Sequence, residues 1–248
     1  MIYNLLTYLR SIAVLLVLCL LVSTAKASPM ETGDAYFIKM EYKQAIDAYE
    51  QAMNTADVGL QWHLARAYIC LSDVSSQEER KVLVEKAEAA ARKCISLDEK
   101  LGAGHSWLAA ALGNRAMYEG SKGKVHLCNE IKKELDRAIE LNPNDDVAYS
   151  ILGSFYSVLG KVSWMERTMA KTFLGGLPAG GYAEGEQALK KAIAIAPTTI
   201  RHWHELAILY ETWGKPEEAH NAYTKAVQLK PQVLSDNERL QTCRKKIS

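Results

Sequence analysis

Residues 203–231 read WHELAILYETWGKPEEAHNAYTKAVQLKP, and their spacing decides the fold of the chain. The informative positions carry alternately small and aromatic side chains, in the order Ala207, Tyr210, Ala219, Tyr223 and Ala226. Steps of three and four residues place side chains on one face of a helix, whereas the step of nine residues leads around Gly214 to a second helix. The small side chains let the two helices approach closely, and the rings fill the space beside them. The stretch therefore predicts an antiparallel helical hairpin that ends at Pro231.

The same spacing occurs in five stretches of the chain. Its first copy is complete and consists of Gly33, Tyr36, Ala45, Tyr49 and Ala52. In the three middle copies, the distance between corresponding positions of the two helices grows from 13 residues to 23, 23 and 33. We therefore expect five hairpins, three of them enlarged, at residues 28–57, 58–100, 102–144, 146–198 and 200–232, followed by a capping helix at 236–247.

The largest insertion, in the fourth hairpin, has a helical pattern of its own. Val162, Met165, Met169 and Phe173 recur at helical spacing, and a glycine-rich stretch follows from Gly175. We expect a short extra helix and then a glycine loop. The loop lacks the Gly-Lys-Ser/Thr ending of a phosphate-binding loop, so the pattern favours a hinge.

The hairpin of residues 203–231 resembles the tetratricopeptide repeat (TPR) residue for residue. That resemblance implies an all-α, TPR-like α-solenoid in a right-handed superhelix, whose first helices line a concave groove. A stack of this kind is usually a binding scaffold and not an active site.

The N-terminus predicts export. Arg10 precedes an apolar run at residues 12–22, and Ala25-Lys26-Ala27 is a small-x-small cleavage site. The run is shorter than the ~20 residues of a membrane-spanning helix. We interpret residues 1–27 as a signal peptide cleaved after Ala27, which places residues 28–248 in an exported compartment, the bacterial periplasm being favoured. An uncleaved N-terminal membrane anchor is the alternative.

A helix is expected to begin directly after this cleavage site. Ser28, Pro29 and Glu31 match an N-cap, a first-turn proline and a capping-box partner. No later segment is apolar enough to cross a membrane, so no stable membrane insertion is expected after cleavage.

Composition and motifs exclude several function classes. The formal net charge of +1 gives no basic excess for a nucleic-acid partner. The six histidines lack metal-ligand spacing, because His202 and His204 point to opposite sides of a helix. His105 is expected to pack or form a hydrogen bond at the start of its helix. No hydrolase motif is present, so we expect no catalytic residues, no metal and no cofactor. Disulfide pairing stays open for Cys70, Cys94, Cys128 and Cys243.

A second resemblance covers about 180 residues. It is carried by residues 62–68, 105–107, 131–143, 152–153 and 162–164, and by Glu166, Arg167, Phe173, Pro178, Tyr182 and Pro197. In their order and in both insertion lengths, these stretches resemble the regulator of microtubule dynamics family, and in particular exported bacterial relatives of it. The resemblance implies an all-helical adaptor without catalysis.

The repeat register also predicts which side chains face the groove. They are Trp62, Arg66, Ile69, Asn114, Ser150, Ser154, Ser157, His204 and Glu211. The wall of the fourth hairpin is small and polar, so an extended peptide is able to approach its backbone closely. An arginine and an asparagine elsewhere in the groove suit a carboxylate or an amide.

These observations predict a non-enzymatic, exported scaffold that binds a protein or peptide partner in its groove. Two alternatives remain: an accessory component of a tripartite solute transporter that contacts small ligands, and a membrane-anchored adaptor. The partner and the oligomeric state stay open, including the possibility of a homo-oligomer.

Overall fold

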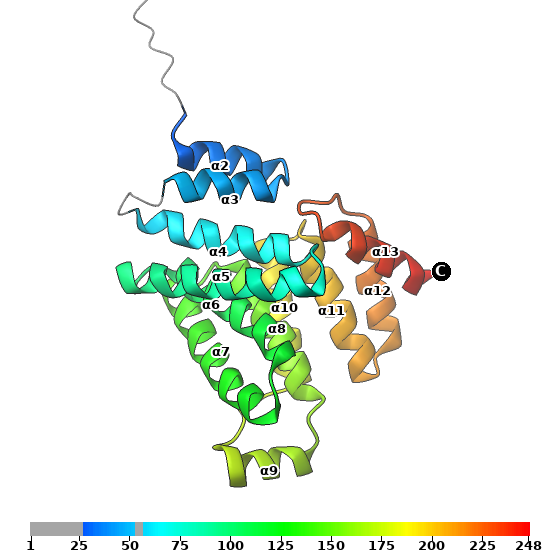
Figure 1. The fold of residues 1–248 in the computed structure, drawn as a ribbon. Coiled ribbons are helices and arrows are strands. Elements are labelled where there is room, and N and C mark those ends of the chain that lie inside the picture. The colour runs from blue at the N-terminus through cyan, green and yellow to red at the C-terminus, as the bar shows by residue number, and fades with distance from the viewer. Residues whose placement is uncertain (1–26, 53–56) are drawn as a thin grey trace, which may run out of the picture.

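The computed structural model describes residues 27–52 and 57–248, and the signal-peptide prediction lies almost entirely outside these residues. The described residues form twelve α-helices and one short 3-10 helix (Figure 1). Five hairpins pair α2 (Pro29–Ile38) with α3 (Tyr42–Gln51), α4 (Val58–Ser72) with α5 (Gln77–Leu97), α6 (Gly102–Arg115) with α7 (Ser121–Leu141), α8 (Asp146–Gly160) with α10 (Tyr182–Ile195), and α11 (Ile200–Trp213) with α12 (Pro216–Val227). Three further elements are η1 (Ala116–Tyr118), α9 (Trp164–Leu174) within the fourth hairpin, and α13 (Asp236–Ile247) at the C-terminal end. The all-α hairpin array is the architecture that the sequence predicted.

Small residues at the repeat positions set how closely the helices pack. Ala207, Ala219 and Ala226 are buried at the contact of α11 with α12. At Gly153 on α8, an added Cβ would lie 2.3 Å from Cγ of Leu189 on α10. These positions need small residues because the facing helix fills the space that a larger side chain would occupy.

The aromatic positions of the repeat also form hydrogen bonds. Four Tyr hydroxyls donate to carboxylates on neighbouring helices: Tyr49 to Asp34 at 2.7 Å, Tyr68 to Glu50 at 2.5 Å, Tyr210 to Glu186 at 2.7 Å and Tyr223 to Glu211 at 2.8 Å. Burial and then the carboxylate partner raise the pKa of each of these phenols above its usual value. The repeat therefore uses tyrosine both to fill space and to satisfy a polar tip.

The first helices of successive hairpins form one continuous layer. Helix α4 packs against α6, α6 against α8, and α8 against α11. We call the surface that α4, α6, α8 and α11 present together the inner face.

The insertion forms the predicted extra helix, α9. Ser163 and Glu166 make a capping box at its start, and Gly175, with φ of 86°, ends it in the left-handed conformation. Arg167 then holds the glycine loop by donating to the carbonyls of Pro178 and Gly180, at 3.2 and 2.8 Å.

The start of the array also follows the local sequence. The Ser28 hydroxyl accepts a hydrogen bond from the Glu31 amide, and the Glu31 carboxylate accepts one from the Ser28 amide. This confirms the predicted capping box at the first described helix. Across residues 27–52 and 57–248, no helix combines the length and the apolar character needed to span a bilayer.

Candidate functional site

The inner face is crossed by the chain's own C-terminal part. We call residues 231–239 the return segment. The Leu234 amide donates to the Tyr42 hydroxyl at 3.2 Å, which links residues 192 positions apart in sequence. Ser235 and Arg239 both contact Oδ2 of Asp73 at 3.4 Å, at the end of α4. The return segment therefore joins the C-terminal helix to the first two hairpins.

Hydrogen bonds within the return segment also stabilise its conformation. The Asp236 side chain is only 2% exposed, and it accepts hydrogen bonds from the amides of Gln232 and Val233 at 2.9 and 3.1 Å. Arg239 pairs with the other Asp236 oxygen at 3.0 Å. Because one buried carboxylate binds two amides and a guanidinium, the segment holds a defined bend on the inner face.

The predicted groove residues lie on this face, but they differ in accessibility. Four of them are buried: Ile69, Ser150, Ser157 and His204. Four are half-buried, namely Trp62, Arg66, Asn114 and Ser154, and Glu211 is exposed. A partner would reach the four buried side chains only after neighbouring segments move.

Several of these residues already have partners within the chain. The Arg66 guanidinium stacks 3.8 Å from the Phe37 ring centroid and lies 5.0 Å from that of Trp62. Ser154 donates to Glu205 at 2.8 Å. Glu211, which accepts from Tyr223, also pairs with Lys246.

The structure places four of the predicted residues at two cavities, whereas Trp62 and Ser157 line neither of them. The central cavity, of about 120 Å³, is lined by Ile69 and Ser150 together with Trp107, Arg201, His202 and Val233. The polar cavity, of about 300 Å³, is lined by Asn114 and His204 together with Arg80, Glu238, Arg239 and Thr242. The return segment contributes to the walls of both cavities. Four of the nine predicted residues therefore line two cavities and not one continuous groove.

Three important residues were missed by the sequence reasoning: Tyr42, Asp73 and Arg201. Asp73 lies in a polar turn, and Tyr42 and Arg201 lie in the first turns of ordinary repeat helices. Their partners or cavity neighbours are far away in sequence, so no local spacing signals them.

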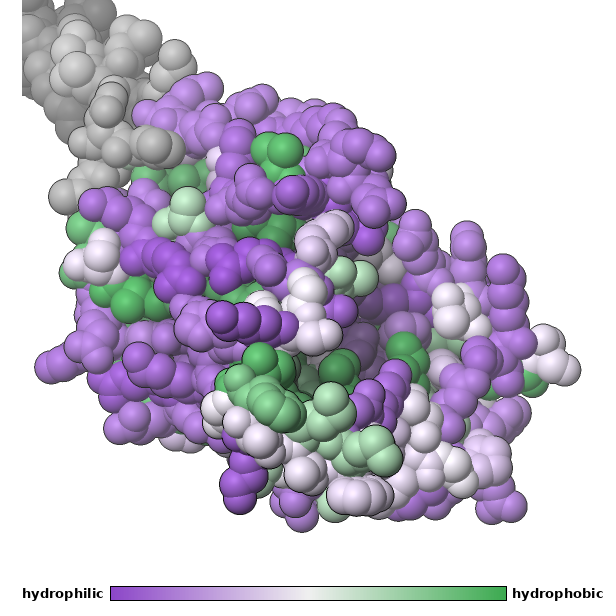
Figure 2. All heavy atoms as spheres, turned by 60° about the horizontal axis from the view of Figure 1, so that its bottom comes forward, coloured by the Kyte–Doolittle hydropathy of each residue, from purple (hydrophilic) through white to green (hydrophobic). Residues whose placement is uncertain are grey.

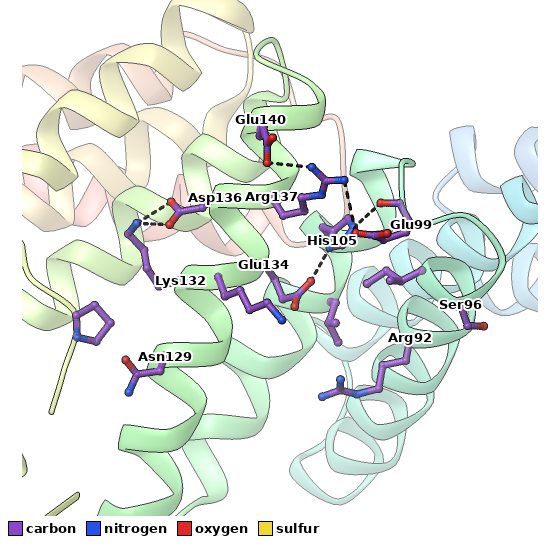
Figure 3. Close-up of a pocket in the computed structure, with 14 residues that line it drawn as sticks. Arg92, Ser96, Glu99, His105, Asn129, Lys132, Glu134, Asp136, Arg137 and Glu140 are labelled. Carbon is purple, nitrogen blue, oxygen red and sulfur yellow. Dashed lines mark hydrogen bonds and ion pairs between the residues drawn. The ribbon is translucent and has the colours of Figure 1, made fainter. Parts of the chain in front are cut away.

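A larger pocket lies on the outer side, between α5, the start of α6 and α7 (Figure 3). It measures about 810 Å³, and charged side chains line much of it. Most of these charges are paired: Lys132 with Asp136 at 2.6 Å, Arg137 with Glu140 at 3.0 Å and Arg92 with Glu130 at 2.6 Å. Since its charges balance internally, this pocket offers little net attraction for a charged ligand.

His105 forms a buried pair at one side of this pocket. Its Nδ1 lies 2.6 Å from the Glu134 carboxylate, and its Nε2 lies 2.9 Å from the Glu99 carbonyl (Figure 3). Both partners accept hydrogen, so the ring satisfies them together only as an imidazolium. Burial opposes protonation, but these two hydrogen bonds raise the pKa of His105 above its ordinary value. His105 thus joins α6 to α7, and the prediction that it forms a hydrogen bond there is confirmed.

The described cysteines are free thiols. Burial raises the pKa of Cys70 to about 12 and those of Cys94 and Cys243 to about 11, and it also raises that of Cys128. Such thiols are poor nucleophiles at neutral pH. Within the part of the chain that the structure describes, no group of three or more His, Cys, Asp or Glu side chains is arranged to hold a metal ion.

The most exposed apolar side chains of the described structure lie mainly on α9. We call Trp164, Met165, Met169 and Phe173 the α9 apolar face, because 56–76% of each residue's surface is exposed. Thr168 and Thr172 lie on the same helix and donate their hydroxyls to carbonyls one turn earlier, at 2.8 and 3.0 Å. Figure 2, which turns the bottom of Figure 1 forward, shows apolar side chains gathered on this side of the molecule.

Comparison with known proteins identifies the family. The model of the family described as Regulator of microtubule dynamics protein 1-3 matches residues 30–248. Regulator of microtubule dynamics protein 1 of Bos taurus is 28% identical over 214 residues, covering 80% of this chain and 68% of the relative. The human protein 1 is 29% identical over 185 residues, covering 67% and 58%. Protein 2 of Mus musculus is 26% identical over 225 residues, covering 90% and 54%. The chain therefore spans between about half and two thirds of the length of these relatives.

Solved structures support the same fold. A thermophilic TPR protein of Thermus thermophilus superposes with a TM-score of 0.64 at 22% identity, covering 87% of this chain and 97% of that one. The Cut9–Hcn1 complex of the APC/C has a TM-score of 0.58 at 14% identity, covering 87% and 35%. At these identities the likeness concerns the fold alone. Taken with the helical hairpins and the family match, it establishes that the chain is a TPR-like solenoid and belongs to the regulator of microtubule dynamics protein 1-3 family.

Proposed function

We propose that this protein is a non-enzymatic, exported scaffold that binds an irregular segment of a protein partner on its inner face. The observation that carries the proposal is the return segment itself. The return segment is already held beside the inner face by the Tyr42 hydroxyl of α3, which accepts from the Leu234 amide, and by the Asp73 carboxylate at the end of α4. A partner segment of similar chemistry would use the same groups.

Binding in this way requires little new order in the scaffold. The helices of the inner face are already packed against one another, so the cost of binding comes from ordering the incoming segment and from displacing the return segment. Asn114 is half-buried beside the polar cavity, and its one hydrogen bond among the described residues is to the Ala110 carbonyl of its own helix. Its amide oxygen is therefore free to accept a hydrogen bond from a partner.

A site-specific photocrosslinking experiment tests the proposal. A photoreactive amino acid at position 114 should capture a discrete partner in the compartment where the protein resides. The matched control places the same group at Glu85, an exposed position on α5. Equal labelling from both positions, or none from position 114, would contradict binding at the inner face.

The substitution Asn114→Ala gives a second readout. It should weaken partner capture and leave the melting temperature unchanged, because the side chain is not part of the core. Arg66→Ala should also weaken capture, but with a loss of stability, because the guanidinium covers the Phe37 ring.

Export is the second part of the proposal. It is supported by the sequence of residues 1–27 and by the helix cap at Ser28, directly after the expected cleavage site. Intact mass of the protein from separated cell fractions tests it. A soluble species that begins at Ser28 is expected. A full-length species retained in the membrane would replace this proposal with a membrane-anchored adaptor.

A further inference from the structure

The central cavity has features of a ligand site that the proposed scaffold function does not require. It lies on the inner face between α4, α6, α8, α11 and the return segment. Its volume of about 120 Å³ corresponds to about four water molecules. Ile69, Trp107, Val147 and Val233 give it apolar walls. Mostly apolar walls with a few polar groups are typical of small-molecule sites.

Three buried polar atoms at this cavity have no hydrogen-bond partner within the described chain: Ser150 Oγ, Arg201 Nε and His202 Nδ1. The residues Ser150 and His202 are each only 1% exposed. Native proteins rarely leave buried polar groups unpaired, and three around one cavity indicate that something fills it.

The acidic residues at the cavity already have partners. Asp146 accepts from His202 Nε2 at 2.9 Å, and Asp73 and Asp236 both contact Arg239. Each of these carboxylates has a partner for at least one oxygen, and among the residues that the structure describes the Arg201 Nε at this cavity has no hydrogen-bond acceptor.

Arg201 lies close enough to a buried carboxylate to interact with it through charge. It is one helical turn from Glu205 on α11. Burial opposes ionisation of Glu205, but His204, the Arg201 charge and the Ser154 hydroxyl together hold its pKa at about 2. Glu205 accepts its hydrogen bond from Ser154 and not from Arg201. The guanidinium therefore keeps its planar set of donors for another acceptor.

We propose that the central cavity binds a small organic carboxylate, with the Arg201 guanidinium and the Ser150 hydroxyl donating to its oxygens. A guanidinium matches a carboxylate in geometry as well as in charge. The cavity volume limits the ligand to a few heavy atoms, and the apolar walls suit a short aliphatic chain. This inference goes beyond the proposed function, because a scaffold that captures a protein segment needs no small-molecule site.

The test is isothermal titration calorimetry of the protein (residues 28–248) with propionate, supported by thermal-shift measurements of its melting temperature. Propionamide is the matched ligand control because it has the same shape without the charge. We expect propionate to bind and to raise the melting temperature, and propionamide to do neither. Binding of both with equal affinity, or of neither, would overturn the proposal.

Two variants distinguish propionate binding in the central cavity from non-specific binding. Arg201→Gln and Ser150→Ala should each weaken propionate by about tenfold or more, since each removes a hydrogen bond to a charged ligand. Arg244→Gln, an exposed arginine on α13, is the matched control and should bind as the parent does. Circular dichroism establishes that each variant is folded, and Ser150→Ala provides the result if Arg201→Gln fails to fold.

Two further ligands define the chemistry. Inorganic phosphate, which is larger in charge and lacks an aliphatic part, should bind more weakly than propionate, and tighter phosphate binding would overturn the carboxylate assignment. A short peptide acid should also bind more weakly, because its backbone exceeds the cavity. Photocrosslinking from position 114 is independent of these titrations, so a failure here is distinguishable from a failure of the scaffold proposal.

Discussion

Helices α9 and α13 are both additions to the plain hairpin array, but they differ in how far their apolar side chains are buried. Helix α9 is rich in large apolar residues, yet Trp164 and Phe173 are 76% and 75% exposed. Helix α13 is mostly polar, yet Leu240 is 4% exposed and Cys243 is fully buried. The reason is position: α13 packs against α11 and α12, whereas α9 packs mainly against α7. Composition alone therefore does not decide which added helix joins a core.

The contrast between α9 and α13 is tested most directly by truncating one apolar side chain in each helix. Leu240→Ala should lower the free energy of unfolding by about 3 kcal/mol, because it empties a packed site between α13 and the array. The matched substitution Met169→Ala on α9 should change it by less than about 0.5 kcal/mol. Denaturant unfolding measures both values. Equal losses would show that α9 is also part of the cooperative core.

The stability of the hairpin array to which both helices are attached should depend on pH through His105. Its folded pKa is raised above the unfolded value of about 6.5, so its stabilising contribution is complete below that pH. As pH rises through the folded pKa, the contribution should be lost, at about 1.4 kcal/mol for every pH unit that separates the folded pKa from the unfolded one. Unfolding measured from pH 5 to 9 tests this in the parent and in His105→Gln, which should lack this component. An unchanged profile in His105→Gln would show that another group is responsible.

The return segment should be easier to detach than α13 itself. Asp73→Ala removes the acceptor of Ser235 and Arg239, and both contacts are long at 3.4 Å. We expect a loss of about 0.5–1 kcal/mol in the free energy of unfolding and faster hydrogen exchange at the return segment. Exchange in α9 is the internal control and should stay the same. No change at the return segment would show that packing of Val233 and Leu234 alone holds it.

The smallest effect on stability is expected from the α9 apolar face. Trp164→Ser combined with Phe173→Ser should change the free energy of unfolding by less than about 0.5 kcal/mol, because both rings already contact solvent. The same pair should increase solubility at high protein concentration, since it removes an exposed apolar surface. A clear drop in stability would place this face against another part of the chain in solution.

Much of the architecture could be predicted because it depends on local spacing. The alternation of small and aromatic residues predicts the hairpins, and the run from Val162 to Phe173 predicts α9. The capping box at Ser28 and the hydrogen-bonded role of His105 follow from their places at helix starts. In each case the determining residues lie within one hairpin or one helical turn.

The candidate sites were less predictable. The register placed Ile69 and Asn114 on the groove-facing helices, but it did not show that the two residues line different cavities. Nor did any pattern indicate that the Arg201 Nε has no hydrogen-bond partner within the part of the chain that the structure describes, because the absence of a hydrogen bond depends on every surrounding element.

Local sequence was sufficient for the hairpin array, because helical periodicity and close-packed small residues act within single hairpins. Only tertiary structure placed the return segment on the inner face, since Tyr42 and Leu234 meet across 192 positions and have no shared periodicity. The same holds for exposure. Whether an apolar residue of α9 or α13 is buried depends on which helices lie opposite it, and that is a property of the assembled array.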